Sequence, residues 1–133
     1  ADIQVNASDY DGLDVSREVP VTAAVDMVGA EYDADCELRE YALINDWQSS
    51  ITFECCRMRS YHAVEVTASN PGAPVKMVFT TDSGMTAAEI EIPSTASLTD
   101  FITVKGTAKP IDGLTDLRCT VSGMLSLRSF RFF

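Results

Sequence analysis

The chain has 133 residues, of which 46% are hydrophobic and 23% are charged, and its net charge is −10. This length suits one hydrophobic core, so we expect residues 1–133 to form a single domain. An acidic chain repels phosphate backbones, which disfavours nucleic acid as a partner. No window approaches the ~18 apolar residues of a membrane span, and the opening ADIQV has no basic region followed by an apolar run. We therefore expect no membrane partner and no signal peptide.

The charge is unevenly spread along the chain. Residues 1–54 hold 13 acidic and 2 basic residues, whereas residues 55–133 hold 7 acidic and 8 basic residues. We interpret the acidic part as a solvated surface.

Most segments alternate apolar and polar residues, the pattern of half-buried β-strands. Residues 23–34, AAVDMVGAEYDA, are the single candidate helix, but Gly29 weakens it and we interpret the segment as strand and loop. Further strands are expected in SSITFEC (49–55), YHAVEVTAS (61–69), PVKMVFTT (74–81), AAEIEIP (87–93), DFITVKG (100–106), TDLRCTVSG (115–123) and LSLRSFRFF (125–133). Gly-, Pro- and Ser-rich turn clusters separate them. Short strands at this spacing predict an all-β sandwich or barrel.

The four cysteines are Cys36, Cys55, Cys56 and Cys119. They form no CxxC pair, which disfavours zinc, and their even number suits two disulfides in an oxidising compartment. Strand alternation places Cys55 and Cys119 inward, and adjacent cysteines rarely bond each other. We predict the disulfides Cys55–Cys119 and Cys36–Cys56. The alternative is four reduced thiols packed as small hydrophobic side chains.

The stretch YALINDW (41–47) brackets a turn signal with two aromatic rings. An even separation puts Tyr41 and Trp47 on one face of a strand, whereas a turn at Asn45-Asp46 would re-aim Trp47. Rings that stand out in water would be available to hold a ligand. The alternatives are a packed tyrosine and a tryptophan that anchors the core.

Five motifs resemble, in the same order, those of family 6 carbohydrate-binding modules. They are ASDYDG (7–12), YALINDW, SYHAVEVTAS (60–69), EIEIPSTASLTDFITVKG (89–106) and GLTDLRCTVSGMLSLRSFRF (113–132). The resemblance implies a jelly-roll β-sandwich of two antiparallel sheets that binds polysaccharide and is not an enzyme. It also implies a secreted or extracellular, monomeric module of a larger chain such as a glycoside hydrolase. The expected ligand is a glucan, a xylan or an anionic algal-type polymer.

The resemblance assigns residues to the family's loop-end cleft. Tyr41 takes the place of its first aromatic ring, and Leu98 falls where the family has a tryptophan. Ser126 and Arg128 fall in the family's asparagine region, and Glu18 falls near its acidic residue. A guanidinium pairs well with carboxylate or sulfate, so Arg128 could favour an anionic sugar.

Some members of the family use a second cleft on the concave face of the sandwich, and there the matching aromatic residue is Trp47. The family's calcium-binding glutamates align with Asn6 and Ser8, which are poor ligands. We therefore expect no required cofactor and a calcium site that is weak or lost. The alternating acids Asp33, Asp35 and Glu37 lack the rest of a calcium loop, and we interpret them as solvated.

The single histidine, His62, has no serine and acid in an order that suggests a catalytic triad. We therefore expect a non-catalytic chain. The alternative function is a structural or protein-interaction β-sandwich that has lost sugar binding.

Overall fold

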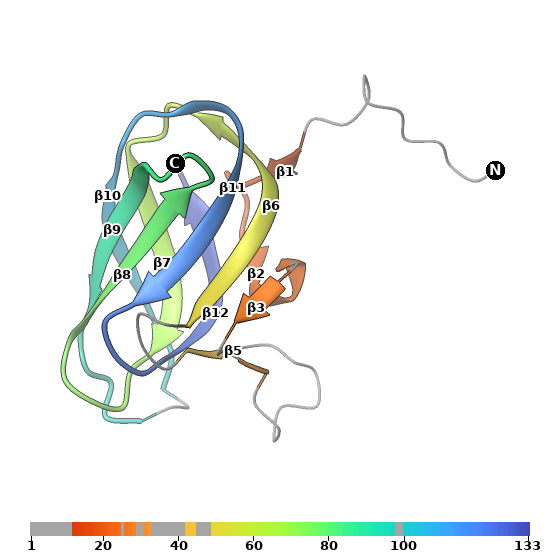
Figure 1. Ribbon diagram of the computed structural model, residues 1–133. Coiled ribbons are helices and arrows are strands. Elements are labelled where there is room, and N and C mark those ends of the chain that lie inside the picture. Colours follow the sequence, from red (N-terminus) through yellow and green to blue (C-terminus); the bar gives the residue numbers. More distant parts are fainter. Residues whose placement is uncertain (1–11, 25, 29–30, 33–41, 45–48, 98–99) are drawn as a thin grey trace.

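The computed structural model describes residues 12–24, 26–28, 31–32, 42–44, 49–97 and 100–133, and over these residues the chain is built from strands (Figure 1). The early strands are short: β1 (Leu13–Asp14), β2 (Val19–Pro20), β3 (Asp26–Val28), β4 (Glu31–Tyr32) and β5 (Ala42–Ile44), with one 3-10 turn, η1 (Val21–Ala23). The later strands are long: β6 (Ser50–Arg59), β7 (Ala63–Ser69), β8 (Val75–Thr81), β9 (Thr86–Ile92), β10 (Ile102–Ala108), β11 (Asp112–Val121) and β12 (Leu125–Phe132). The described part of residues 23–34 contains β3 and β4, which agrees with the interpretation of this segment as strand and loop.

The strands pair in the order β1-β6-β11-β8-β9-β10-β7-β12-β5-β4, and β2 and β3 add to β12 and β6. Among the described strands, every pair is antiparallel except β1 with β6. Between β9 and β10 only Thr107↔Glu89 and Ala108↔Ala88 are paired. The sheet therefore folds over at this narrow link into two layers, which Figure 1 shows with β8, β11 and β6 in front of β7 and β12. The predicted all-β sandwich is confirmed.

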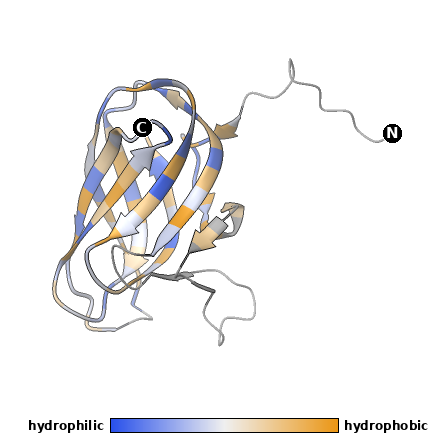
Figure 2. Cartoon of the chain, viewed as in Figure 1, coloured by the Kyte–Doolittle hydropathy of each residue, from blue (hydrophilic) through white to orange (hydrophobic). Residues whose placement is uncertain are grey.

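The core lies between the two layers and follows the alternation of the sequence. Figure 2 shows hydrophobic and hydrophilic residues alternating along the long strands. Four completely or almost completely buried rings, Phe53, Phe79, Phe130 and Phe132, form one cluster. The rings of β12 lie 4.8 to 5.7 Å from those of the opposite layer between centroids, and Phe130 and Phe132 lie 5.9 Å from each other. Each such ring contributes a large buried apolar area, so this cluster holds the two layers together.

A β-bulge in β6 shifts the alternation by one residue. Phe53 pairs with Leu117 and Cys56 pairs with Thr115, so Glu54 and Cys55 together face Asp116 on β11. Cys55 has a φ of 52°, in the left-handed region, and its N–H donates to Asp116 Oδ1 over 3.0 Å. An inserted residue in this conformation is how a bulge bends and re-aims a strand.

The bulge overturns the predicted disulfides. Cys55 is half-buried. Cys119 is opposite Ile51 on β6, and Ile51 is four residues from Cys55, so the two cysteines are about 13 Å apart along the strand. A disulfide needs Cα atoms within about 7 Å. The three cysteines that the structure describes are free thiols, so the prediction for Cys56 was also wrong, and its intended partner Cys36 lies outside the described residues. Burial raises the pKa of Cys56 to about 12, which makes this thiol a poor nucleophile.

Candidate functional site

The outer side of β6, β11 and β8, here called the Arg118 face, carries a shallow depression of about 390 Å³. At its centre, Arg118 on β11 is in register with Thr52 on β6 and with Thr80 on β8. The residues that line the depression are Thr52, Thr80, Thr81, Asp82, Gly84, Asp116, Arg118 and Thr120. Since successive residues of a strand point to opposite faces, this polar row is the outward counterpart of the buried residues beneath it.

One rim of the depression is fixed by the turn between β8 and β9. Thr81 Oγ1 accepts a hydrogen bond from Met85 N over 3.1 Å, and Asp82 N donates to Thr115 Oγ1 over 3.3 Å. Asp82 Oδ2 in turn accepts a hydrogen bond from Asp116 N over 3.4 Å. These contacts hold two carboxylates at the edge of the depression.

The centre of the depression is chemically open. Among the described residues, the side chains of Thr52, Thr80, Thr120 and Arg118 make no hydrogen bond and no ion pair. Three hydroxyls and a guanidinium that no neighbour satisfies are available to hydroxyl or carboxylate groups of a ligand. The arrangement can thus bind a polar, polyhydroxylated molecule.

At the loop end of the sandwich, a second bulge places Arg128 on the outside of β12. Leu127 pairs with Ala68 and Ser129 pairs with Thr67, so Arg128 is the extra residue. Its Cζ lies 4.3 Å from the centroid of the Phe101 ring, close enough for a cation–π interaction. The guanidinium is therefore held over a ring that directly precedes β10.

The other predicted residues on and beside β12 have different surroundings. Ser126 is completely buried, and its Oγ has no hydrogen-bond partner among the described residues. Glu18 is exposed, and its Oε2 accepts a hydrogen bond from Ser129 Oγ over 2.8 Å. The structure thus places Ser126 and Arg128 on β12 and brings Glu18 beside that strand at Ser129. Glu18 is exposed, and Arg128 is half-buried.

The predicted aromatic and apolar site residues Tyr41, Trp47 and Leu98 lie outside the described residues. Two described residues lie close to them in the sequence. Ala42 pairs with Leu127 on β12, and Phe101 contacts Arg128. Their assignment to a sugar site stays a prediction.

The loop between β7 and β8 is built around the buried side chain of Asn70. Its Nδ2 donates to Ala73 O over 2.8 Å and to Ile92 O over 3.1 Å, and its Oδ1 accepts from Gly72 N over 3.0 Å. This loop and residues 122–124 line a further depression of about 390 Å³ at the loop end. The loops beside β12 are thus rigidly supported from the core.

Sequence reasoning missed Arg118, Thr52 and Thr80. Each is visible in the sequence as an outward position of an alternating strand, but so are many other polar residues. Their convergence depends on the register of β6, β11 and β8, which no pattern within one strand encodes.

Two observations on the described residues concern metals and membranes. Within the described ranges, no group of three or more His, Cys, Asp or Glu side chains could hold a metal ion. The positions at issue for calcium, Asn6, Ser8, Asp33, Asp35 and Glu37, lie outside those ranges. No helix in the described part of the chain is long and apolar enough to cross a membrane.

By sequence, the chain matches no protein-family profile and no curated protein. Its structure is similar to a family 6 carbohydrate-binding module from Clostridium cellulolyticum in complex with xylose, with a TM-score of 0.82, 10% identity and coverage of 91% of this chain and 99% of that one. A β-1,3-glucan-binding module of the same family from Bacillus halodurans has a TM-score of 0.79 at 18% identity and covers 92% and 98% of the two chains.

A third similar structure is a family 43 arabinoxylan arabinofuranohydrolase from Bacillus subtilis in complex with cellotetraose. The TM-score is 0.76 at 9% identity, and the match covers 92% of this chain but 28% of the enzyme. The chain therefore has the fold of family 6 carbohydrate-binding modules over nearly its whole length, and the jelly-roll class predicted from the motifs is confirmed.

Proposed function

We propose that this protein is a non-catalytic carbohydrate-binding module that docks a secreted protein onto a polysaccharide. The observation that carries the proposal is the depression around Arg118, where hydrogen-bonding side chains without partners line the open face of a fold shared with sugar-binding modules. Shared fold alone does not determine function, so the proposal depends on the chemistry of this site.

The chemistry of the depression suits sugar hydroxyls. Arg118 supplies donors, the threonine hydroxyls can donate or accept, and the carboxylates of Asp82 and Asp116 accept. An aromatic ring would add stacking on the apolar side of a sugar, and Trp47 is the residue proposed for this role. It precedes Ser49, a buried residue next to the start of β6, which is one of the three strands of the Arg118 face.

The loop end is the second contact region in this proposal. Arg128, held over Phe101, would meet a carboxylate, a sulfate or a hydroxyl of the sugar. Tyr41 and Leu98 would contact its apolar side, and Glu18 would accept hydrogen bonds from its rim. The ligand is then a neutral glucan or xylan, or an anionic polymer where Arg128 contributes most.

The non-catalytic part of the proposal is supported by where the carboxylates of Asp82 and Asp116 lie in the depression. Glycoside hydrolysis needs two carboxyl groups on opposite sides of one bond. Asp82 and Asp116 sit instead at one rim and accept hydrogen bonds from backbone amides. The partial match to a longer hydrolase supports a module that is appended to a larger protein. We propose that this larger protein is extracellular and that the module requires no cofactor.

Titration of soluble glucans, xylans and uronic or sulfated polysaccharides, followed by intrinsic fluorescence and affinity gel electrophoresis, tests the proposal. Binding to at least one polymer is expected. Arg118→Ala and Trp47→Ala should weaken binding on the Arg118 face, and Tyr41→Ala and Arg128→Ala should weaken it at the loop end. Lack of response to the whole panel would rule the proposal out, and binding insensitive to all four variants would refute the site assignment.

A second candidate is a structural or protein-interaction sandwich that has lost sugar binding. It is favoured by Ser126, which stands in the family's asparagine region and is completely buried. On this alternative, the panel gives no binding although the chain is fully folded by circular dichroism.

A further inference from the structure

Three carboxylates lie along one side of Arg118 on the outer surface of the sandwich. Asp116 lies two positions before Arg118 on β11, and Glu54 on β6 and Asp82 after β8 lie beside Asp116 on the flanking strands. Figure 1 shows these three strands side by side. Since residues two positions apart on a strand face the same side, the acids form a second row about 7 Å from the row that contains Arg118.

The β6 bulge and the β8–β9 turn hold two of these carboxylates. Asp116 Oδ1 accepts a hydrogen bond from the N–H of Cys55 over 3.0 Å, and Asp82 Oδ2 accepts one from the N–H of Asp116 over 3.4 Å. A backbone N–H carries no net charge, so both carboxylates keep their full negative charge. The third, Glu54, is exposed at the bulge next to Asp116. The acid row is therefore uniformly negative at neutral pH.

The acid row is not neutralised by Arg118. Among the residues that the structure describes, neither Arg118 nor any of the three carboxylates forms an ion pair. The guanidinium and the acids therefore border the depression as separate charges, three negative and one positive.

The other basic side chains described on β6, β8, β9 and β11 are engaged elsewhere. Lys76 on β8 is paired with Glu89 on β9, with 3.2 Å between Nζ and Oε1. Beyond the bulge in β6, Arg57 has an interaction partner of its own, and Arg59 is directly opposite Asp112. None of these cations offsets the negative charge beside Arg118.

This arrangement treats hydroxyls and anions differently. Carboxylates accept hydrogen bonds from sugar hydroxyls, and such charge-assisted bonds are stronger than those between neutral groups. A carboxylate or sulfate that paired with Arg118 would instead lie within about one screening length of three like charges. The groups that favour a neutral sugar therefore oppose an anionic one.

We propose that Glu54, Asp82 and Asp116 make the Arg118 face selective for uncharged sugars and against uronic or sulfated ones. The inference rests on the proposed function and deepens it, since it chooses between neutral and anionic ligands for this face. Arg118 then donates to hydroxyls and does not act as a partner for an anion.

The test measures the preference of the full chain for the neutral member of two polymer pairs by titration calorimetry. Hydroxyethylcellulose is paired with carboxymethylcellulose, and laminarin with sulfated laminarin. Wild-type protein should prefer the neutral member by about fivefold, since the acids exceed the guanidinium by two charges at about 7–8 Å. Raising the salt from about 0.01 M to about 1 M shortens the screening length from about 30 Å to about 3 Å and should narrow this preference.

Glu54→Gln and Asp82→Asn each remove one negative charge and keep an amide oxygen as an acceptor. Each should reduce the preference about twofold, and the double variant should reduce it about fivefold. Thermal unfolding checks that the variants are folded. Glu54→Gln keeps the inference testable if Asp82→Asn disturbs the β8–β9 turn, because Glu54 makes no hydrogen bond within the described ranges.

Asp100→Asn is the matched control, because it removes the same charge from an exposed residue at the loop end of the sandwich. Asp82 is at the other end, and the seven residues of β9 between them span about 23 Å, which exceeds the screening length at physiological salt. The preference should therefore be unchanged in Asp100→Asn.

Equal changes in Glu54→Gln and Asp100→Asn would show an effect of net charge alone and overturn the inference. Tighter wild-type binding of the charged member of either pair would also overturn it, as would neutral binding that Arg118→Ala does not weaken. Both of these results leave the proposed function intact, whereas failure to bind any polymer would refute both.

Discussion

The two outer faces of the sandwich are both polar, but they differ in what their polar groups do. On the outer side of β10, β7 and β12, here called the Phe133 face, Thr67 and Thr103 share a hydrogen bond of 3.0 Å. Lys105 Nζ and Arg131 Cζ lie 4.8 and 4.9 Å from the centroid of the Phe133 ring. These side chains bind one another.

On the Arg118 face, the central hydroxyls and the guanidinium have no such partners in the described part of the chain. Polar composition alone therefore does not distinguish a binding face from a solvated one. A face becomes available to a ligand where the register sets donors and acceptors side by side without satisfying them.

The largest expected effect is on stability and comes from a substitution in the core that supports both faces. Phe130 on β12 contacts Phe53 and Phe79 on the opposite layer, at 4.8 and 5.0 Å between centroids. Phe130→Ala should lower the free energy of unfolding by about 3–5 kcal/mol, because it leaves a cavity. Urea unfolding followed by circular dichroism measures this, and Phe130→Leu, which keeps most of the volume, should lose much less. Equal losses in the two variants would contradict the packing described.

A smaller loss is expected at the β6 bulge. Asp116→Ala removes the acceptor for the N–H of Cys55 and should lower the free energy of unfolding by about 1.5–3 kcal/mol, since the lost bond is to a charged group. Urea unfolding is again the measurement. Glu54→Ala, an exposed acid at the same bulge, is the control and should stay within about 0.5 kcal/mol of wild type.

Polysaccharide binding by surface variants distinguishes the Arg118 face from the Phe133 face most directly. Arg118→Ala should weaken polysaccharide binding about tenfold, or about 1.4 kcal/mol, without changing stability. Arg131→Ala should leave neutral-polymer binding unchanged, because Arg131 lies on β12, in the layer opposite the Arg118 face. Affinity electrophoresis in the polymer that binds best gives both values, and the reverse order of effects would assign the site to the Phe133 face.

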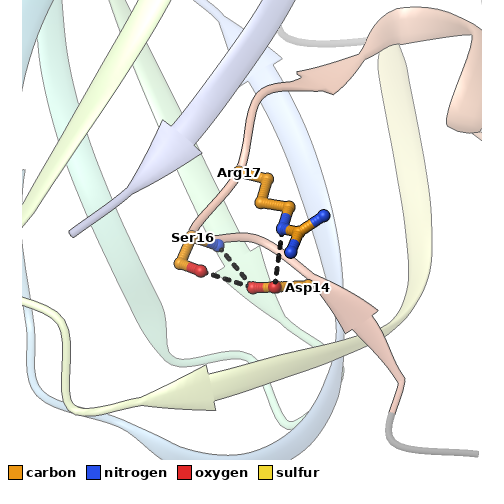
Figure 3. A network of polar contacts seen from close by, with 3 residues as sticks. All are labelled: Asp14, Ser16 and Arg17. Atoms are coloured by element: carbon orange, nitrogen blue, oxygen red, sulfur yellow. Dashed lines mark hydrogen bonds and ion pairs between the residues drawn. The ribbon is translucent and has the colours of Figure 1, made fainter.

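The smallest expected effect is a pH dependence at Asp14. Its pKa is lowered in the folded chain from the usual 3.8, so its contribution to stability is complete above that value and is lost as the pH falls through the lower, folded pKa. Ser16→Ala should move the pKa of Asp14 back toward 3.8. An NMR titration of the Asp14 carboxyl measures the shift, with wild type, in which the Ser16 hydroxyl contacts Asp14 (Figure 3), as the reference.

Much of the fold could be predicted because burial in a strand has a period of two. The segment AAEIEIP placed Ile90 and Ile92 on the buried side, and PVKMVFTT did the same for Met77 and Phe79, as the structure shows. The prediction was wrong at Cys55, where the sequence SSITFEC continues the pattern but the strand does not. The left-handed residue is held there by Asp116 from another strand, 61 positions away.

The candidate site, like the fold, could be predicted from the sequence only in part. Motif resemblance pointed to Ser126 and Arg128 on β12 and to Glu18, which contacts Ser129 of that strand. Glu18 is exposed and Arg128 is half-buried, whereas Ser126 is completely buried. The resemblance did not point to Arg118 or to the arginines beyond the bulge, since their exposure depends on partners from other strands. Tyr41, Trp47 and Leu98 stay predictions that the binding variants test.

The sequence by itself determined the all-β class, the positions of the long strands and most of the core. Each strand segment carries its own alternation of apolar and polar residues, so these features can be predicted from one segment at a time. The tertiary structure alone decided the bulges in β6 and β12, the free cysteines and the row formed by Thr52, Arg118 and Thr80. Those features arise from register between strands that are distant in the chain, and a shift of one residue exchanges the buried side for the exposed side.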